Sequence, residues 1–211
     1  VLLVATGRTG TDFFQSLLDS HPQILQFPGA WFYHQWWQVA RCRNNVSDLV
    51  NEFIWQASPA YNHISKFISC YDTMERWDKL GDKKNESFKV NIDAFRNHML
   101  NIFSERELNR QNFFLALNLA YGMATNIDIF NTKILFYHIH QSDKLAAFKE
   151  DFSDFDVITM VREPRNTLVS GIDNMKKFRS DVMFSSSILH YTLRRIFQGA
   201  EVILRYTNNV R

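Results

Sequence analysis

Residues 1–14 read VLLVATGRTGTDFF, and this order of residue types decides how the first part of the chain folds. Residues 1–5 are an unbroken apolar run, which is typical of a strand buried on both faces of a sheet. Gly7 and Gly10 mark a short turn after it. The apolar side chains that follow recur at the spacing of a helix that buries one side: Phe13, Phe14, Leu17 and Leu18. We therefore predict a strand, a tight turn and a helix.

The turn between this strand and this helix has the features of a phosphate site. Two glycines permit a backbone that points successive N–H groups at one spot, and the helix N-terminus favours negative charge there. Arg8 adds a cation inside the turn. The Lys of a GxxxxGK[ST] loop is absent, so an ATP site of the Walker type is not predicted. The alternative is that Gly7 and Gly10 only connect the strand to the helix.

A second motif lies at residues 157–170, VITMVREPRNTLVS. The apolar residues predict a buried strand that ends at Arg162, and Pro164 suits the first turn of a helix. Ser170 then lies two turns into that helix. A guanidinium and a hydroxyl are good donors to phosphate. The alternative is that Arg162 pairs with Glu163 or with a helix end.

The two motifs, in this order, resemble the sulfotransferases that use 3′-phosphoadenosine 5′-phosphosulfate (PAPS). Residues 6–14, with Ser20-His21-Pro22 behind them, are similar to that family's 5′-phosphosulfate loop. Arg162 and Ser170, eight positions apart, resemble the pair that binds the 3′-phosphate. The resemblance covers about residues 1–28 and 133–206. It implies PAPS as the co-substrate.

The resemblance also implies roles for single residues of the first loop. Arg8 contacts the oxygen that bridges phosphate and sulfate, and Phe13 packs near the nucleotide. The 5′-phosphate is cradled by Gly7 and by the N–H groups of Thr9, Gly10, Thr11 and Asp12. Asp12 departs from the family, which has Ser or Thr there. We expect its carboxylate to turn toward the free N–H groups of its own helix, as acids in first turns do.

A catalytic base is expected at the end of a later strand, in Tyr137-His138-Ile139-His140. The two histidines project from one face of the strand, and an imidazole titrates near neutrality. The stretch is similar to the Lys-Thr-His segment of the cytosolic sulfotransferases, which implies His140 as the base and His138 as helper or substitute. Alternatively, both histidines merely end a strand. Residues 28–30 offer no Glu of the kind that many carbohydrate sulfotransferases use, and His34 is a distant alternative.

The order of the elements predicts an α/β fold: a three-layer, mostly parallel sheet flanked by helices, P-loop-like, with a helical insertion. Further strands are expected at residues 24–27, 133–140, 156–161 and 201–206. Helices are expected at 88–103, from a capping box at 104–107 to about 125, and at 143–152, 163–178 and 185–198. Residues 72–87 are polar and are expected to be a loop or a frayed helix end.

Residues 1–211 are interpreted as one sulfotransferase-like domain, in which residues 30–130 form a helical insertion on the acceptor side. Most of the aromatic side chains in that insertion are expected in the core and a few in an acceptor pocket. The family adds a segment with Gly and Arg or Lys after the last strand. Because the sequence ends at Arg211, that C-terminal part of the family fold is expected to be absent here, either because the segment was not included or because the protein is incomplete as an enzyme.

Composition limits the classes of partner that the sequence predicts. A formal net charge of +2 gives no signal for nucleic acid, and no apolar segment reaches the roughly 18–20 residues that span a bilayer. Two cysteines, Cys42 and Cys70, argue against a disulfide framework and against a Cys-based metal site; free thiols are expected, with a single bridge as the alternative. No His, Asp and Glu cluster has metal-ligand spacing, so no metal is predicted. A cytoplasmic location is the default, with a luminal domain cut from its anchor as the alternative.

The function predicted from these features is transfer of a sulfuryl group from PAPS to a hydroxyl or amine of a small-molecule or carbohydrate acceptor. The reaction is an in-line displacement with a histidine base. Two alternatives stay open. One is a nucleotide or sugar kinase-like P-loop enzyme, which the missing Walker Lys disfavours. The other is a catalytically silent nucleotide-binding module.

Overall fold

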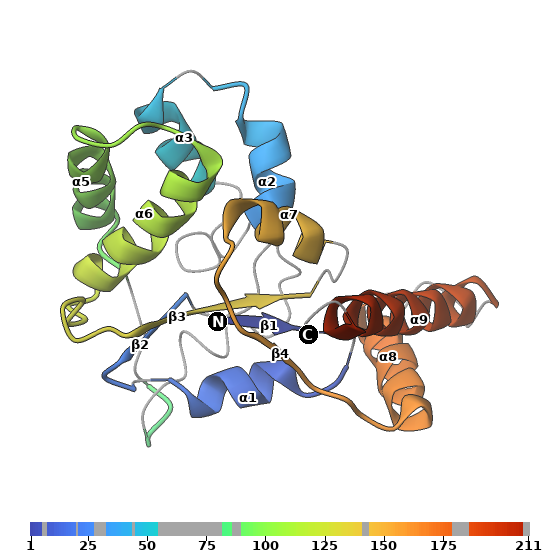
Figure 1. Ribbon diagram of the computed structural model, residues 1–211. Coiled ribbons are helices and arrows are strands. Elements are labelled where there is room, and N and C mark those ends of the chain that lie inside the picture. Colours follow the sequence, from blue (N-terminus) through green and yellow to red (C-terminus); the bar gives the residue numbers. More distant parts are fainter. Residues whose placement is uncertain are drawn as a thin grey trace. The chain divides into compact units, whose positions relative to one another are not determined.

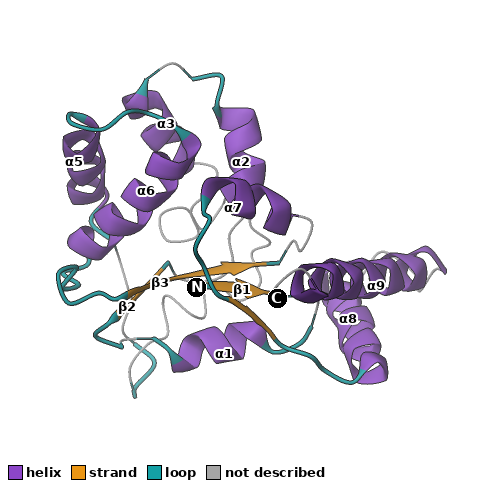
Figure 2. Ribbon diagram, in the orientation of Figure 1, coloured by secondary structure: helices purple, strands orange, loops and turns teal. Residues whose placement is uncertain are grey.

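The computed structural model describes residues 1–5, 8–19, 21–27, 33–43, 45–54, 82–85, 90–140, 144–178 and 186–208. Its described strands form a four-stranded parallel sheet with the order β2-β3-β1-β4, flanked by eight described helices (Figures 1 and 2). This confirms the α/β class and the parallel sheet. The chain divides into two compact units, residues 1–17 with 138–211, and residues 18–137.

The strands of the first unit are β1 (Leu2–Val4) and β4 (Val157–Thr159), which pair in parallel with Leu2 opposite Val157. All three residues of β1 are buried, as the unbroken apolar run predicts. The amide of Ala5, just past β1, donates to the carbonyl of Ile139 at 2.9 Å. Ile139 is the last residue of β3 (Ile134–Ile139), so β1 and β3 end side by side.

Four helices complete the first unit: α1 (Thr11–Leu17), α7 (Leu145–Asp151), α8 (Pro164–Phe178) and α9 (Ser186–Asn208). Figure 1 shows α1 and α7 on opposite sides of the strands. Helices α8 and α9 approach each other closely at Gly171 of α8. A Cβ atom placed on Gly171 would lie 2.8 Å from Cγ2 of Thr192 in α9. Glycine is therefore what permits this contact.

Two predictions for this unit are wrong. Residues 201–206 were expected to be a strand, but they belong to α9, where Glu201 and Arg205 form an ion pair one turn apart. A short apolar run fits a strand or a buried helix equally, and here the helix that precedes it continues. The predicted buried stripe of α1 is also misplaced. Thr11 and Gln15 are its buried residues, whereas Phe13 and Leu17 are 67% and 64% exposed.

The second unit contains β2 (Ile24–Gln26), paired in parallel with the first residues of β3. Its helices are α2 (Tyr33–Ala40), α3 (Val46–Glu52), α5 (Ile92–Phe103) and α6 (Arg110–Ala124). Their core is aromatic. Tyr33 and Trp36 are buried, and their rings contact neighbours such as Phe53, Phe113 and Phe114. Core packing thus accounts for these rings, as expected for most of them; Trp31, Phe32 and Trp55 lie outside the described residues.

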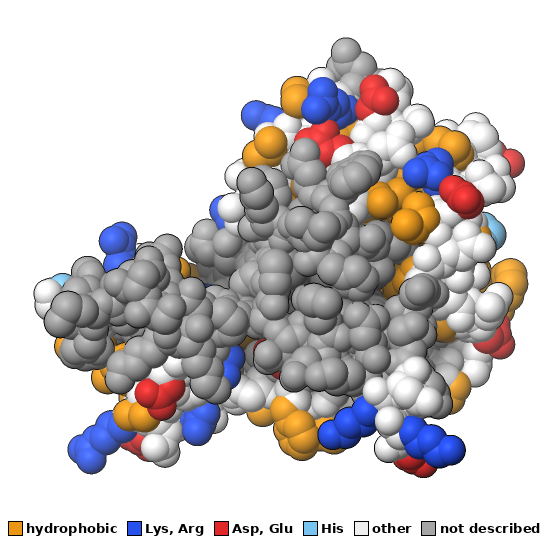
Figure 3. Space-filling view, turned by 180° about the vertical axis from the view of Figure 1, so that it is seen from behind, with side chains coloured by type: hydrophobic (Ala, Val, Ile, Leu, Met, Phe, Trp, Pro, Cys, Tyr) orange, Lys and Arg blue, Asp and Glu red, His pale blue; other side chains and the backbone are white. Residues whose placement is uncertain are grey.

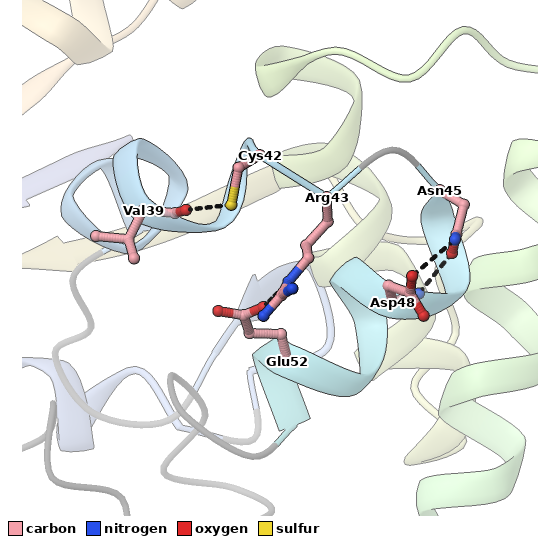
Figure 4. Close-up of polar contacts among 6 residues, drawn as sticks. All are labelled: Val39, Cys42, Arg43, Asn45, Asp48 and Glu52. Atoms are coloured by element: carbon pink, nitrogen blue, oxygen red, sulfur yellow. Dashed lines mark hydrogen bonds and ion pairs between the residues drawn. The ribbon is translucent and has the colours of Figure 1, made fainter.

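Polar contacts fix the connection from α2 to α3 (Figure 4). The Asn45 side chain accepts from the amide of Asp48 at 2.8 Å, which caps the N-terminus of α3. The same side chain donates to the Asp48 carboxylate at 2.7 Å. Arg43 pairs with Glu52 at 2.6 Å, which closes the connection onto the end of α3. The Cys42 thiol donates to the carbonyl of Val39 at 3.2 Å. Cys70 lies outside the described residues.

The capping box predicted at residues 104–107 is wrong in position. Ser104 ends α5, and the N-cap of α6 is Asn109, whose side chain accepts from the amide of Asn112 at 2.8 Å. The extent of the helix to Thr125, its C-cap, agrees with the prediction. Helix α5 likewise begins later than residue 88, after Asn91 as its N-cap. Side-chain acceptors at both caps are asparagines, which the Ser-x-x-Glu pattern does not detect.

Charged side chains of both signs lie interspersed among the described residues on the face in Figure 3, with no broad patch of one sign. This agrees with the small net charge of +2. Within the described part of the chain, no helix has the length and apolar character needed to cross a membrane.

Candidate functional site

The first loop and the second motif meet beyond the carboxyl ends of β1 and β4. Arg8 Nε donates to Ser170 Oγ at 3.4 Å, and a guanidinium nitrogen of Arg162 donates to the backbone carbonyl of Arg8 at 3.2 Å. These residues are separated by more than 150 positions along the chain. The fold thus brings together the three donor side chains that the sequence analysis chose from two separate motifs.

The start of α8 explains how Arg162 is held at this edge. The Glu163 carboxylate accepts from the amide of Asn166 at 2.8 Å, and the Glu163 carbonyl accepts from the amide of Thr167 at 3.0 Å. Glu163 therefore caps its own helix. Among the described residues it forms no ion pair with Arg162. The Arg162 side chain is exposed and is directed at the Arg8 backbone instead.

The described part of the first loop has the backbone that its glycine predicts. Gly10 has φ +89°, a conformation that L side chains rarely adopt, and its carbonyl accepts from the amide of Phe14 at 3.0 Å. Thr9 and Thr11 are buried. The hydroxyl of Thr9 has no hydrogen-bond partner within the described ranges. Thr6 and Gly7 lie outside the described residues.

Both histidines of the predicted base segment lie at the end of β3, as expected. Their rings are edge to face, with centroids 4.7 Å apart. The His138 side chain is fully buried, whereas the His140 side chain is 34% exposed. Only His140 of the pair can therefore meet a molecule that arrives from solvent.

Asp12 lies against these two histidines. Its Oδ1 atom is 3.6 Å from Nε2 of His140 and 3.7 Å from Nδ1 of His138. We expected this carboxylate to turn toward the N–H groups of α1. The structure gives Oδ1 two imidazoles as neighbours, which the sequence analysis did not foresee. Gln15, on the same helix, also contacts His138, so the first turns of α1 lie against the end of β3.

Two further residues support the histidines. Gln15, one turn after Asp12 on α1, places Oε1 2.9 Å from Nδ1 of His138. Arg195 of α9 donates to the backbone carbonyl of His140 at 3.3 Å. Neither residue was predicted. Gln15 falls on the helix face that the apolar pattern assigned to solvent, and Arg195 precedes a segment that was assigned to a strand.

The structure also describes Phe13 and His34, which the sequence analysis named as a nucleotide contact and as a distant alternative base. The Phe13 side chain is 67% exposed on α1. His34 belongs to the second unit, where it is 2% exposed and its ring lies edge to face with that of Tyr33. The first unit therefore supplies three donors, Arg8, Arg162 and Ser170, beside a second group made of Asp12, His138 and His140.

Comparisons with known proteins add no assignment: no family model, no curated protein and no solved structure matches the chain.

Proposed function

We propose that the chain is a PAPS-dependent sulfotransferase, which transfers a sulfuryl group to a hydroxyl or amine of a small-molecule or carbohydrate acceptor. The observation that carries the proposal is the meeting of Arg8, Arg162 and Ser170. Arg8 lies more than 150 positions from Arg162 and Ser170 in the sequence, and the fold brings the two motifs within hydrogen-bond distance. A nucleotide with phosphate groups at both the 3′ and the 5′ positions needs such convergent donors at an exposed sheet edge.

Each donor has a role in this proposal. Arg162 and Ser170 bind the 3′-phosphate, and Arg8 neutralises the charge that develops on the bridging oxygen as the sulfur–oxygen bond breaks. The Arg8–Ser170 contact is a bond between a cation and a neutral hydroxyl. When a phosphate binds, both groups exchange it for bonds to phosphate oxygens, where the acceptor carries a negative charge and the bond is stronger.

His140 is the proposed general base. The acceptor oxygen forms its bond to sulfur as the bond from sulfur to the bridging oxygen breaks, and the acceptor proton passes to the His140 imidazole. Adenosine 3′,5′-bisphosphate leaves. The 34% exposure of the His140 side chain favours it over the fully buried His138 for this step. His138 is the helper, which packs against the His140 ring.

The proposed donor site is tested by calorimetric titration of adenosine 3′,5′-bisphosphate and of ADP into the wild type and Arg162→Ala. The wild type should prefer the bisphosphate, and Arg162→Ala should lose about 1.5–3 kcal/mol of binding free energy, which is about tenfold or more in affinity. Arg165→Ala removes an exposed charge from the same helix turn and is the matched control. It should bind nearly as the wild type does. Preferential binding of ADP, unchanged in Arg162→Ala, would contradict the proposal and favour a kinase-like site.

Turnover separates an enzyme from a silent nucleotide-binding module. With PAPS and a panel of hydroxyl and amine acceptors, the wild type should release the bisphosphate in an acceptor-dependent manner. His140→Gln should bind the bisphosphate normally and lose most of this release, since a general base contributes about 10²–10⁴-fold. A His140→Gln variant with full turnover would remove His140 from the mechanism.

A further inference from the structure

The three side chains Asp12, His138 and His140 form a compact group at the junction of α1 and the end of β3. One potential ligand atom from each lies within 4.8 Å of the others. Oδ1 of Asp12 is the shared neighbour, at 3.6 Å from a nitrogen of His140 and 3.7 Å from a nitrogen of His138. Both distances exceed a hydrogen bond. The three atoms therefore face one another across a gap that direct hydrogen bonds do not close.

The gap has the size that a small divalent cation needs. Zinc binds imidazole nitrogen and carboxylate oxygen at about 2.0–2.2 Å, so two ligands at a tetrahedral angle lie about 3.4 Å apart. The observed separations of 3.6 and 3.7 Å are within a few tenths of an ångström of that value. Small side-chain movements would bring the three atoms into coordination distance.

From this geometry we propose that Asp12, His138 and His140 bind a divalent transition-metal ion, with Zn²⁺ as the preferred ion. Two imidazoles and one carboxylate are a ligand set for Zn²⁺, Co²⁺ and Fe²⁺ rather than for Mg²⁺ or Ca²⁺, which prefer oxygen ligands. Three protein ligands leave the fourth position for water or another molecule. The partly exposed His140 and Asp12 side chains give the ion a route from solvent.

The surroundings of His140 fit this assignment, whereas His138 must give up one hydrogen bond. Nε2 of His140 is buried and makes no hydrogen bond to any described residue, so it can accept a metal without giving up a bond. Nδ1 of His138 lies 2.9 Å from Oε1 of Gln15, and metal binding at this atom exchanges that hydrogen bond for a coordinate bond. Arg195 holds the backbone of His140 through its carbonyl, which leaves the imidazole nitrogens to the metal.

The metal also has a consequence for catalysis, which rests on the proposed function. A nitrogen of His140 that coordinates Zn²⁺ no longer has a lone pair for the acceptor proton. Metal binding and sulfuryl transfer would therefore exclude each other, and Zn²⁺ would act as an inhibitor that a chelator reverses. Asp12, the residue that departs from the sulfotransferase pattern, supplies the carboxylate that this inhibition needs.

The metal site is tested without a nucleotide, on full-length protein that carries no histidine tag and has been treated with a chelator. On titration with Co²⁺, the visible absorption typical of a four- or five-coordinate Co²⁺ ion should appear and saturate at one equivalent. Zn²⁺ should displace the Co²⁺ and abolish this absorption. Mg²⁺ should not displace Co²⁺. Asp12→Asn and His140→Gln should each weaken Zn²⁺ binding at least tenfold, since loss of even an outer-shell partner typically costs 10–100-fold.

The matched control is His190→Gln, which removes an exposed histidine of α9 and should bind Co²⁺ as the wild type does. Circular dichroism of each variant shows that it is folded. Wild-type protein with no stoichiometric Co²⁺ spectrum, or Asp12→Asn with unchanged affinity, would overturn the metal site. The Co²⁺ titration contains no nucleotide and the bisphosphate titration contains no metal, so a protein that binds one ligand but not the other identifies which proposal has failed.

Discussion

Gly171 of α8 gives the sharpest test of the packing that carries the proposed donor site, because it follows Ser170 directly. A Cβ atom at Gly171 would lie 2.8 Å from Cγ2 of Thr192, closer than real Cβ contacts allow. Gly171→Ala therefore has two opposed effects on the free energy of unfolding. Alanine in a helix interior is worth about 0.5–1 kcal/mol over glycine, and overpacking costs about 1–3 kcal/mol. The expected net result is a loss of about 1 kcal/mol.

Thr192→Ser removes the methyl group that causes the clash and keeps the hydroxyl. In that background Gly171→Ala should change sign and stabilise the protein by about 0.5–1 kcal/mol. Thr192→Val keeps the clashing methyl group and replaces the hydroxyl by a second methyl group, so Gly171→Ala should remain destabilising there. Urea unfolding followed by circular dichroism gives the free energies, and the double-mutant cycle removes the separate cost of each Thr192 substitution. If Gly171→Ala has the same effect in the wild type and in Thr192→Ser, within about 0.5 kcal/mol, the close approach of α8 and α9 is refuted.

Two more substitutions test the second unit. Asn109→Ala removes the side-chain acceptor that caps α6, so urea unfolding should show a loss of about 1 kcal/mol; no loss would mean that the cap is not formed. Tyr137→Phe removes the hydroxyl that accepts from the buried amide of Tyr33 at 3.3 Å, and should cost about 1–3 kcal/mol. Burial raises the pKa of the Tyr137 hydroxyl above its ordinary value of 10.0, so the folded protein keeps a proton that the unfolded chain releases. Wild-type stability should therefore be retained below about pH 10 and fall above it, and the fall should be shallower in Tyr137→Phe; an equal fall in both proteins would contradict this role of Tyr137.

The strands of the sheet could be predicted from the sequence because each is a short apolar run between a turn and a helix signal. β1 and β4 were found in this way, and their parallel pairing follows from the helices between them. The strand predicted from the apolar run at residues 202–204 was wrong, because the spacing and number of apolar residues in so short a run do not distinguish a strand from a buried helix. The ion pair of Glu201 with Arg205, four positions later, is the helix signal that would have decided it.

The donor half of the site was predicted, since its residues follow strand ends and parallel strands bring such ends to one edge. The Asp12, His138 and His140 group was not. His138 and His140 share a face of β3 by their spacing, but the position of Asp12 depends on which side of α1 packs on the sheet. The apolar pattern gave the wrong side, because α1 buries Thr11 and Gln15 and exposes Phe13. A buried polar face on a short helix carries no signal in hydrophobic periodicity.

The most direct test of the central claim compares two ligands that differ by one group, adenosine 3′,5′-bisphosphate and adenosine 5′-phosphate, in binding to the wild-type protein. If Arg162 and Ser170 bind a 3′-phosphate, the bisphosphate should bind at least about tenfold more tightly, since one charge-assisted contact is worth about 1.5–3 kcal/mol. Equal dissociation constants for the two ligands would show that the 3′-phosphate has no site, and would contradict the sulfotransferase proposal.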